Sequence, residues 1–243
     1  MKYSKNFLVE VILHIKYNPL PELCDDFENQ TKEFQNIITE EFPEIEYEKK
    51  KNLSFTIDST GKPIKADSKY ATLTFTNEGK QIKFNEEELI LSYSGKKYQS
   101  YEKFQKDINL VLKGLKEFKL EKIKFLGLRY INQIKLDDNS RVNEYINPNL
   151  NLINIEFDNK EFIQSITRAE LKIDDYNLAF QYGQYSPNFP GRAINKEFIL
   201  DYDCVLDFSE EFKYIPIDLD EMHEIIINRF EHDIKDKLRE KMR

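Results

Sequence analysis

The chain has 243 residues, of which 40% are hydrophobic and 13% aromatic, so it contains enough apolar material for a packed core and is not intrinsically disordered. Its 7 glycines and 8 prolines are too few for a collagen-like or linker-dominated protein, and they form no Gly-rich phosphate loop. The formal net charge of -8, from 36 basic and 44 acidic side chains, argues against long-range attraction to bare nucleic acid.

Cysteine usage and the apolar runs indicate where the chain functions. Cys24 and Cys204 are too few for the disulfide framework of a small secreted protein, and neither belongs to a C-x-x-C pair. The apolar run near the N-terminus is short and contains Glu10, and no stretch approaches the ~20 apolar residues that cross a bilayer. We therefore expect a cytoplasmic protein without a signal peptide and without a membrane segment.

In chain order, the first half predicts one strand, one long helix, a set of hairpin strands and a second long helix. Apolar residues alternate with polar ones in the strands, and they recur every three or four residues in the helices. The sequence Asn77-Glu78-Gly79-Lys80 marks a hairpin turn. The predicted elements are a strand over 7–17, a helix over 23–42, strands over 52–58, 70–76, 80–84 and 88–93, and a helix over 101–118.

The second half repeats the order of strand, helical segment, several strands and long helix. In that final helix, Asp218 and Glu221 have the spacing of a capping box, with Asp218 as the cap. The predicted elements are a strand over 125–136, a short helix or ordered loop over 141–150, strands over 151–157, 161–173, 176–182 and 196–208, and a helix from 218 to the end.

This repetition predicts an α+β protein with two antiparallel sheet lobes of related topology, at 1–122 and 123–243, packed as one compact unit. Each long amphipathic helix has one apolar stripe and is expected to cover a sheet face. The repetition is typical of an old duplication. Identity between the halves is slight, however, and an ordinary α+β domain can show the same order by coincidence, so both interpretations stand at this point.

Several short segments resemble a known family. They are Leu8-Val9-Glu10-Val11, Glu41-Phe42-Pro43, Gly127-Leu128-Arg129-Tyr130-Ile131-Asn132-Gln133-Ile134, and Phe198 to Asp203 before the C-terminal helix. Together they resemble a sporadically distributed family of uncharacterised bacterial and archaeal proteins, with Gln133 where Arg is expected in many relatives. The resemblance implies a stand-alone prokaryotic protein without an established enzymatic activity. The patchy occurrence of the family suggests mobile gene cassettes, including antiviral defence.

Arg129, Tyr130 and Asn132 lie at the centre of this motif. Alternation along the strand turns Leu128 and Tyr130 inward and Arg129 to the opposite face. There the guanidinium either pairs with a buried carboxylate, such as Glu10 on the first strand, or clamps a carboxylate or phosphate of a ligand in bidentate fashion. We expect the structural pair first, and a ligand clamp only if Arg129 is exposed in a cleft.

The strand over 196–208 carries a row of carboxylates on one face. Among them, Asp201 and Asp203 are spaced to hold Mg²⁺ for chemistry on phosphate esters or nucleotides. A strand that faces water shows the same alternation without any chemistry, and no Gly-rich loop or P-loop lysine accompanies the pair. We therefore expect no metal and no cofactor, and a Mg²⁺-dependent enzyme is the alternative function.

The three histidines form no recognisable metal motif. His223 and Glu224 begin like the zinc motif H-E-x-x-H, but position 227 is Ile. Asp220, His223 and Glu224 share one side of the predicted helix, which is typical of a solvated face. The sequence contains no G-x-S-x-G and no assignable Cys–His pair, so nucleophilic hydrolysis has no support.

The irregular segment over 181–192 is the candidate partner-binding surface. It places Tyr182, Tyr185, Phe189 and Arg192 among prolines and glycines. Tyrosine and arginine are favoured at binding hot spots, and loops on rigid sheets commonly carry recognition. The same residues also suit an ordinary hairpin connection that buries its aromatic side chains against its own lobe.

The leading hypothesis is a non-catalytic recognition or regulatory protein that binds a protein partner encoded nearby, with a place in an antiviral defence cassette. A second alternative is nucleic-acid binding through a local basic face formed by Lys49-Lys50-Lys51 with Lys62 and Lys65. The acidic residues at 44, 46 and 48 argue against that face. The sequence does not indicate the oligomeric state.

Overall fold

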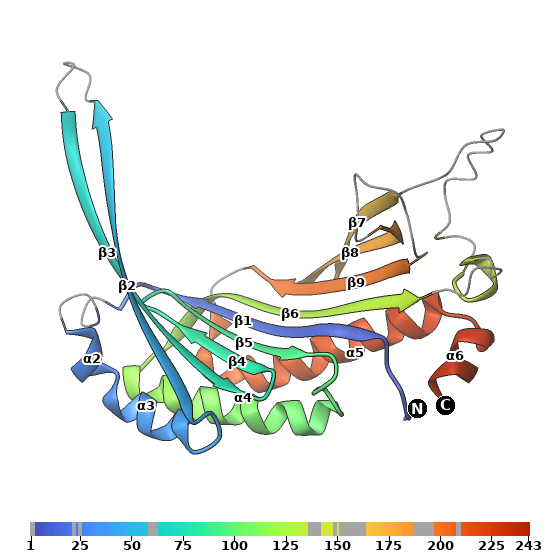
Figure 1. The fold of residues 1–243 in the computed structure, drawn as a ribbon, viewed down its shortest axis with the longest axis horizontal. Coiled ribbons are helices and arrows are strands. Elements are labelled where there is room, and N and C mark those ends of the chain that lie inside the picture. The colour runs from blue at the N-terminus through green and yellow to red at the C-terminus, as the bar shows by residue number, and fades with distance from the viewer. Residues whose placement is uncertain are drawn as a thin grey trace.

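The fold combines one large antiparallel sheet with helices, and this confirms the predicted α+β class. The computed structural model describes residues 3–20, 23, 26–57, 63–135, 142–147, 150, 164–186, 197–207 and 210–243, and all statements below refer to these residues. Figure 1 shows helices α3, α4 and α5 on the same side of the sheet. The two ends of the chain lie close together, since the Lys5 amide donates to the Met242 carbonyl at 3.0 Å.

The described residues contain ten strands, five α-helices and three short 3₁₀ helices. The strands are β1 (Leu8–Tyr17), β2 (Glu44–Ile57), β3 (Pro63–Asn77), β4 (Lys80–Phe84), β5 (Glu88–Ser94), β6 (Lys122–Lys135), β7 (Ser165–Ile173), β8 (Tyr176–Tyr185), β9 (Glu197–Leu206) and β10 (Glu210–Glu211). The helices are α2 (Phe27–Gln30), α3 (Lys32–Thr39), α4 (Tyr101–Leu115), η1 (Lys116–Phe118), η2 (Val142–Glu144), η4 (Phe212–Tyr214), α5 (Ile215–Asp233) and α6 (Asp236–Met242).

All ten strands belong to one continuous sheet. Its order is β2-β3-β4-β5-β1-β6-β9-β8-β7, with β10 paired to β6. The strands from the two halves of the chain meet where β1 pairs with β6 in antiparallel fashion. The expected separation into two sheets is therefore wrong: the two groups of strands are the two sides of a single sheet, joined by backbone hydrogen bonds.

The central pair of strands forms the middle of the core. Alternation places one face of each strand toward the helices, and the apolar residues on that face are opposite one another in register. Every one of these side chains is at most 3% exposed. The pairs are Val11 with Tyr130, Leu13 with Leu128, and Ile15 with Leu126.

Helices α3 and α4 approach closely because a glycine lies at their contact. A Cβ atom at Gly114 would lie 2.7 Å from Cδ2 of Phe34, which is closer than real Cβ contacts. Phe34 is fully buried and stacks on Phe84 of the sheet at a ring-centroid distance of 4.3 Å. The glycine weakens α4 by roughly 1 kcal/mol relative to alanine, and the helix–helix contact explains why this position has no side chain.

The structure differs from the predicted helices at three points. The helix predicted over 23–42 is divided at Thr31, whose buried hydroxyl donates to the Phe27 carbonyl at 2.7 Å and competes with the helical pattern. The predicted capping box is wrong, because α5 begins at Ile215, ahead of Asp218, with Pro216 in its first turn. The C-terminal helix also ends at Asp233, and α6 follows after Ile234, which has extended backbone angles.

The hairpin formed by β2 and β3 is much longer than the sequence pattern predicted. Figure 1 shows it projecting from the rest of the sheet. Only 73–77 of β3 pair with β4, whereas β2 and β3 pair with each other along their whole length. At the other end of β3, Glu78 and Gly79 both have positive φ, which forms the tight turn that the sequence predicted.

Within the described ranges, none of the helices combines the length and apolar character needed to span a membrane.

Candidate functional site

The motif on β6 distributes its residues over both faces of the sheet. Arg129 lies on the face opposite the helices, and Tyr130 and Asn132 lie on the helix side, where they are 3% and 5% exposed. This confirms the predicted opposition of Arg129 and Tyr130. The two faces of the sheet have different chemistry.

Arg129 is held by a carboxylate on the neighbouring strand β9. Its Nε and Nη2 atoms donate to Oδ1 and Oδ2 of Asp201 at 2.8 and 2.6 Å, a bidentate pair. Asp201 is 4% exposed, and its hydrogen bonds raise the pKa of Arg129. A structural pair with a buried carboxylate was expected, but the partner is Asp201 instead of Glu10.

The carboxylate row on β9 is therefore already engaged by a protein contact at Asp201. Both oxygens of Asp201 face the guanidinium, and burial raises the pKa of Asp203, which disfavours its charged form. No cluster of three or more metal-ligating side chains occurs in the described part of the chain. Asp201 is thus the ion-pair partner of Arg129, and Asp203 lies opposite Arg129 on the neighbouring strand.

On the helix side, Tyr130 and Asn132 line a cavity of about 460 Å³, which we call the tyrosine cleft. The cleft lies between the residues that precede β1, the start of α4, strand β6 and helix α5. A second cavity of about 580 Å³ shares Tyr101, His223 and Glu224 with it. The side chains that give the cleft its character are Tyr98, Tyr101, Tyr130, Asn132, His223 and Phe230.

A chain of hydrogen bonds and ring contacts connects the walls of the cleft. The hydroxyl oxygens of Tyr98 and Tyr130 are 3.0 Å apart, and the Tyr130 hydroxyl is 3.1 Å from Nδ1 of His223. The His223 ring stacks on Tyr101 with centroids 3.8 Å apart and planes at 6°. The Tyr101 hydroxyl donates to Asp220 at 2.9 Å. These contacts hold the four side chains in fixed positions relative to one another.

The environment keeps the side chains of Tyr98, Tyr130 and His223 in the cleft uncharged at neutral pH. Burial lowers the pKa of His223, although Glu224, Asp220 and Glu102 oppose this with their negative charge. Burial raises the pKa of Tyr98 to about 12 and that of Tyr130 well above its usual value. The tyrosines thus remain hydroxyl groups, and His223 remains a neutral imidazole.

The lowered pKa of His223 predicts a stability change in mildly acidic solution. In the unfolded chain His223 has its ordinary pKa of 6.5, whereas in the folded chain its pKa is lower. The contribution of the neutral imidazole to the free energy of unfolding is therefore fully present above pH 6.5, and it is lost as the pH falls through the pKa of the folded state. We expect the difference in urea midpoint between the native chain and His223→Gln to shrink from pH 7.5 to pH 5. A difference that is independent of pH would contradict the buried neutral state.

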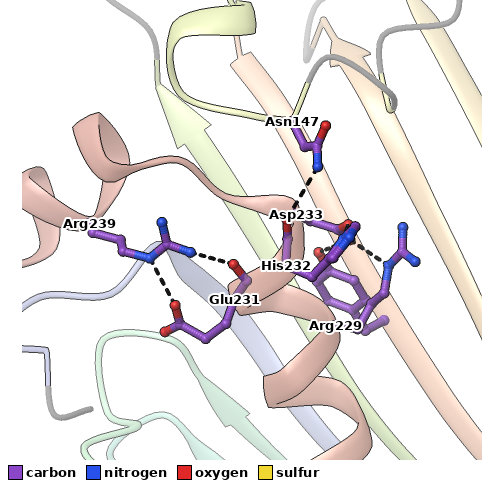
Figure 2. Close-up of polar contacts among 7 residues, drawn as sticks. Asn147, Arg229, Glu231, His232, Asp233 and Arg239 are labelled. Carbon is purple, nitrogen blue, oxygen red and sulfur yellow. Dashed lines mark hydrogen bonds and ion pairs between the residues drawn. The ribbon is translucent and has the colours of Figure 1, made fainter.

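A second buried polar cluster joins α5 to the sheet, and Figure 2 shows it. Asp233, at the end of α5, is fully buried. Its Oδ2 accepts hydrogen bonds from the Tyr202 hydroxyl at 2.9 Å and from Nε of Arg229 at 2.8 Å. Nδ1 of His232 is 3.2 Å from Oδ1. The Asp233 carbonyl accepts from the Asn147 amide at 2.8 Å, so one residue connects three segments.

Only part of the predicted partner-binding segment over 181–192 lies within the described residues. Tyr182 lies in β8, is 4% exposed and stacks on Phe180 at a centroid distance of 5.3 Å, so its side chain belongs to the core and not to a loop surface. Phe189, Arg192 and the side chain of Tyr185 lie outside the described residues. The binding role of that loop remains a prediction.

Sequence reasoning did not identify Tyr98, Tyr101 or His223 as site residues. Tyr101 has the spacing of an ordinary core position of α4, and His223 shares its helix side with acidic residues, which is typical of a solvated surface. In the structure, the ring of Tyr101 covers His223. The tyrosine-rich stretch before α4 was the one feature of the sequence that could have indicated this site. It forms a site only through its contacts with residues that are distant in the sequence.

Comparison of the chain with known protein families, with curated proteins and with solved structures finds no match.

Proposed function

We propose that the protein is a non-catalytic, cytoplasmic recognition protein that binds a segment of a protein partner in the tyrosine cleft. The observation that carries the proposal is the cleft itself, with a volume of about 460 Å³, aromatic walls and fixed polar groups. Binding sites typically combine an apolar concave surface with a few oriented polar side chains. On the other face of the sheet, Asp201 of the carboxylate row is already engaged by Arg129.

The chemistry of the walls suits partner recognition. Tyrosine supplies large contact area with few rotatable bonds, and it is enriched at binding hot spots. The hydrogen-bonded ring system of Tyr98, Tyr130, His223 and Tyr101 is already ordered, so little side-chain entropy is lost on binding. Ile227 adds an apolar side chain to the cleft and is 37% exposed, so an incoming segment can reach it.

We infer further that the two halves, 1–122 and 123–243, are related lobes from an old duplication, each with a long amphipathic helix covering its part of the sheet. The strand order supports this inference. The central antiparallel neighbours β1 and β6 are flanked by β5 and β9, and each flanking strand is followed by a long helix, α4 or α5. The equivalent elements therefore occur in the same order on both sides of the β1–β6 pair.

A partner encoded by a neighbouring gene and a place in an antiviral defence cassette also belong to this proposal. They rest on the resemblance carried by the β6 motif. Tyr130 and Asn132 of that motif line the tyrosine cleft, so the segment on which the resemblance is based also contributes to the proposed binding site.

The proposal is tested by blocking the cleft without changing its charge. Ile227→Trp places a bulky side chain in the cleft, and Ile217→Trp is the matched control, since Ile217 is 57% exposed on the same helix and does not line the cleft. Each variant is co-expressed with the products of the neighbouring genes, and complexes are recovered through a tag on this chain.

We expect Ile227→Trp to reduce recovery of the partner at least tenfold, whereas Ile217→Trp leaves it unchanged. Both side chains are exposed, so neither substitution is expected to change the free energy of unfolding by more than about 0.5 kcal/mol. Equal recovery with both variants would show that the cleft is not the partner site.

A further inference from the structure

Building on the proposed function, we propose that the tyrosine cleft recognises an organic cation, namely the guanidinium group of an arginine side chain on the partner. Three independent features of the cleft support this choice: its aromatic rings, its acidic surroundings and an acceptor on Asn132 to which no described residue donates.

The walls present aromatic rings that attract cations. Tyr98 and Tyr101 line the cleft and are partly exposed, and the buried rings of Tyr130, Tyr202 and Phe230 complete its aromatic lining. The face of an aromatic ring carries negative electrostatic potential, so a cation near it is stabilised, most strongly where water is excluded. A guanidinium group is planar and weakly hydrated, and it therefore stacks on such rings more readily than a compact ammonium group.

The charged residues around the cleft are mostly acidic. Glu102, Glu224 and Glu231 line it, and Lys5 is its one cationic lining residue among those described. Glu231 is engaged by Arg239 at 3.0 Å and by the Tyr3 hydroxyl at 2.5 Å. The field of Glu102 and Glu224 reaches the middle of the cleft, since both raise the pKa of His223 against the effect of burial. An anionic ligand would be repelled here.

Asn132 supplies an acceptor that no described residue uses. Its side chain is 5% exposed, and its Nδ2 donates to the Leu200 carbonyl at 3.3 Å, which orients the amide. Among the described residues nothing donates to its Oδ1, which belongs to a side chain lining the cleft. A guanidinium carries five N–H donors and no acceptor, and thus complements this oxygen. Phosphate and carboxylate ligands have no such donors.

The test uses a model arginine and its neutral near-isostere. The probes are N-acetyl-arginine methylamide, the corresponding citrulline compound, in which a urea replaces the guanidinium, and the lysine compound. The chain has 3 histidines, so a protein with ¹³C-labelled histidine gives few ring signals. His223 reports on the cleft, and His14 and His232, which do not line it, serve as internal controls.

We expect the arginine probe to shift the His223 signal saturably, while citrulline causes no comparable shift and lysine binds more weakly. Equal binding of citrulline would overturn the choice of a cation, and equal or tighter binding of lysine would overturn the choice of guanidinium. Glu224→Gln should weaken arginine binding about fivefold, and Lys5→Met should strengthen it by a similar factor. Glu240→Gln, an exposed carboxylate outside the cleft, should have no effect.

The outcomes also separate this inference from the proposed function. If Ile227→Trp abolishes capture of the partner while Glu224→Gln and Lys5→Met leave capture unchanged, the cleft is the partner site and its occupant is not a cation. If Ile227→Trp leaves capture of the partner unchanged, the cleft is not the partner site and the proposed function is wrong. Binding of the arginine probe to the cleft would not reverse that conclusion.

Discussion

Replacement of Arg129 by alanine is expected to lower the free energy of unfolding by about 3 kcal/mol. The reason is the carboxylate that remains: Asp201 is 4% exposed and loses both hydrogen bonds of its bidentate partner. Breaking a buried ion pair from one side typically costs 3–5 kcal/mol, and the lower end applies because the Arg129 side chain is 36% exposed, so water can approach the vacated position. Urea denaturation of both proteins measures the difference.

Two variants show whether the unpaired charge causes this loss. Adding Asp201→Asn to Arg129→Ala removes the charge that was left behind and should recover at least half of the lost stability. Arg168→Ala is the control, because Arg168 pairs with Glu170 on the surface, where the two side chains are 51% and 70% exposed. Such a pair contributes about 0–1 kcal/mol. An unchanged midpoint for Arg129→Ala would contradict the structural role and make Arg129 the first residue to test for ligand recognition.

Replacement of Asp233 by alanine is expected to have an effect at least as large, about 3–5 kcal/mol. Asp233 is fully buried, and its carboxylate accepts from Tyr202 and Arg229 (Figure 2). Its removal leaves the Tyr202 hydroxyl without its acceptor in the core and Arg229 without its counter-charge. Thermal and urea unfolding should both show the loss.

The contribution of the Tyr202 hydroxyl to the free energy of unfolding can be measured separately. In the Asp233→Ala background, Tyr202→Phe removes the donor that has lost its partner and should restore about 1–2 kcal/mol, whereas Tyr202→Phe alone should destabilise the protein. Asp236→Ala is the control, since the Asp236 side chain is 92% exposed and should contribute no more than about 1 kcal/mol. Additive effects of the two substitutions at 202 and 233 would refute the coupling.

Local pattern was sufficient to predict most strands and the faces that they bury. The alternation around Arg129 correctly separated it from Tyr130, because the direction of a side chain in a strand depends only on its position. The identity of its partner was not predictable in the same way. Asp201 reaches Arg129 because β9 pairs with β6 in a particular register, and that register depends on tertiary packing across the sheet.

The ends of the helices and the residues of the cleft could not be predicted either, because both depend on tertiary contacts. Thr31 interrupts a helix whose apolar spacing continues past it, because a buried hydroxyl competes for a backbone carbonyl. The tyrosine cleft combines residues near 98–101, 130–132 and 223–230. Each of these segments has an ordinary pattern by itself, and a cavity lined by all three appears only when the sheet places β6 beneath α5.

The position of β1 in the sheet has a consequence for synthesis of the chain. Its neighbours are β5 and β6, and its register partner Tyr130 follows Val11 after nearly half of the chain. A nascent chain that has emerged only as far as α4 therefore has a complete set of first-half strands but one open edge on β1. An unpaired edge is a template for a strand of another chain. Prompt translation through Lys122–Lys135 closes this edge within the same molecule, so a pause just before β6 favours association between neighbouring nascent chains.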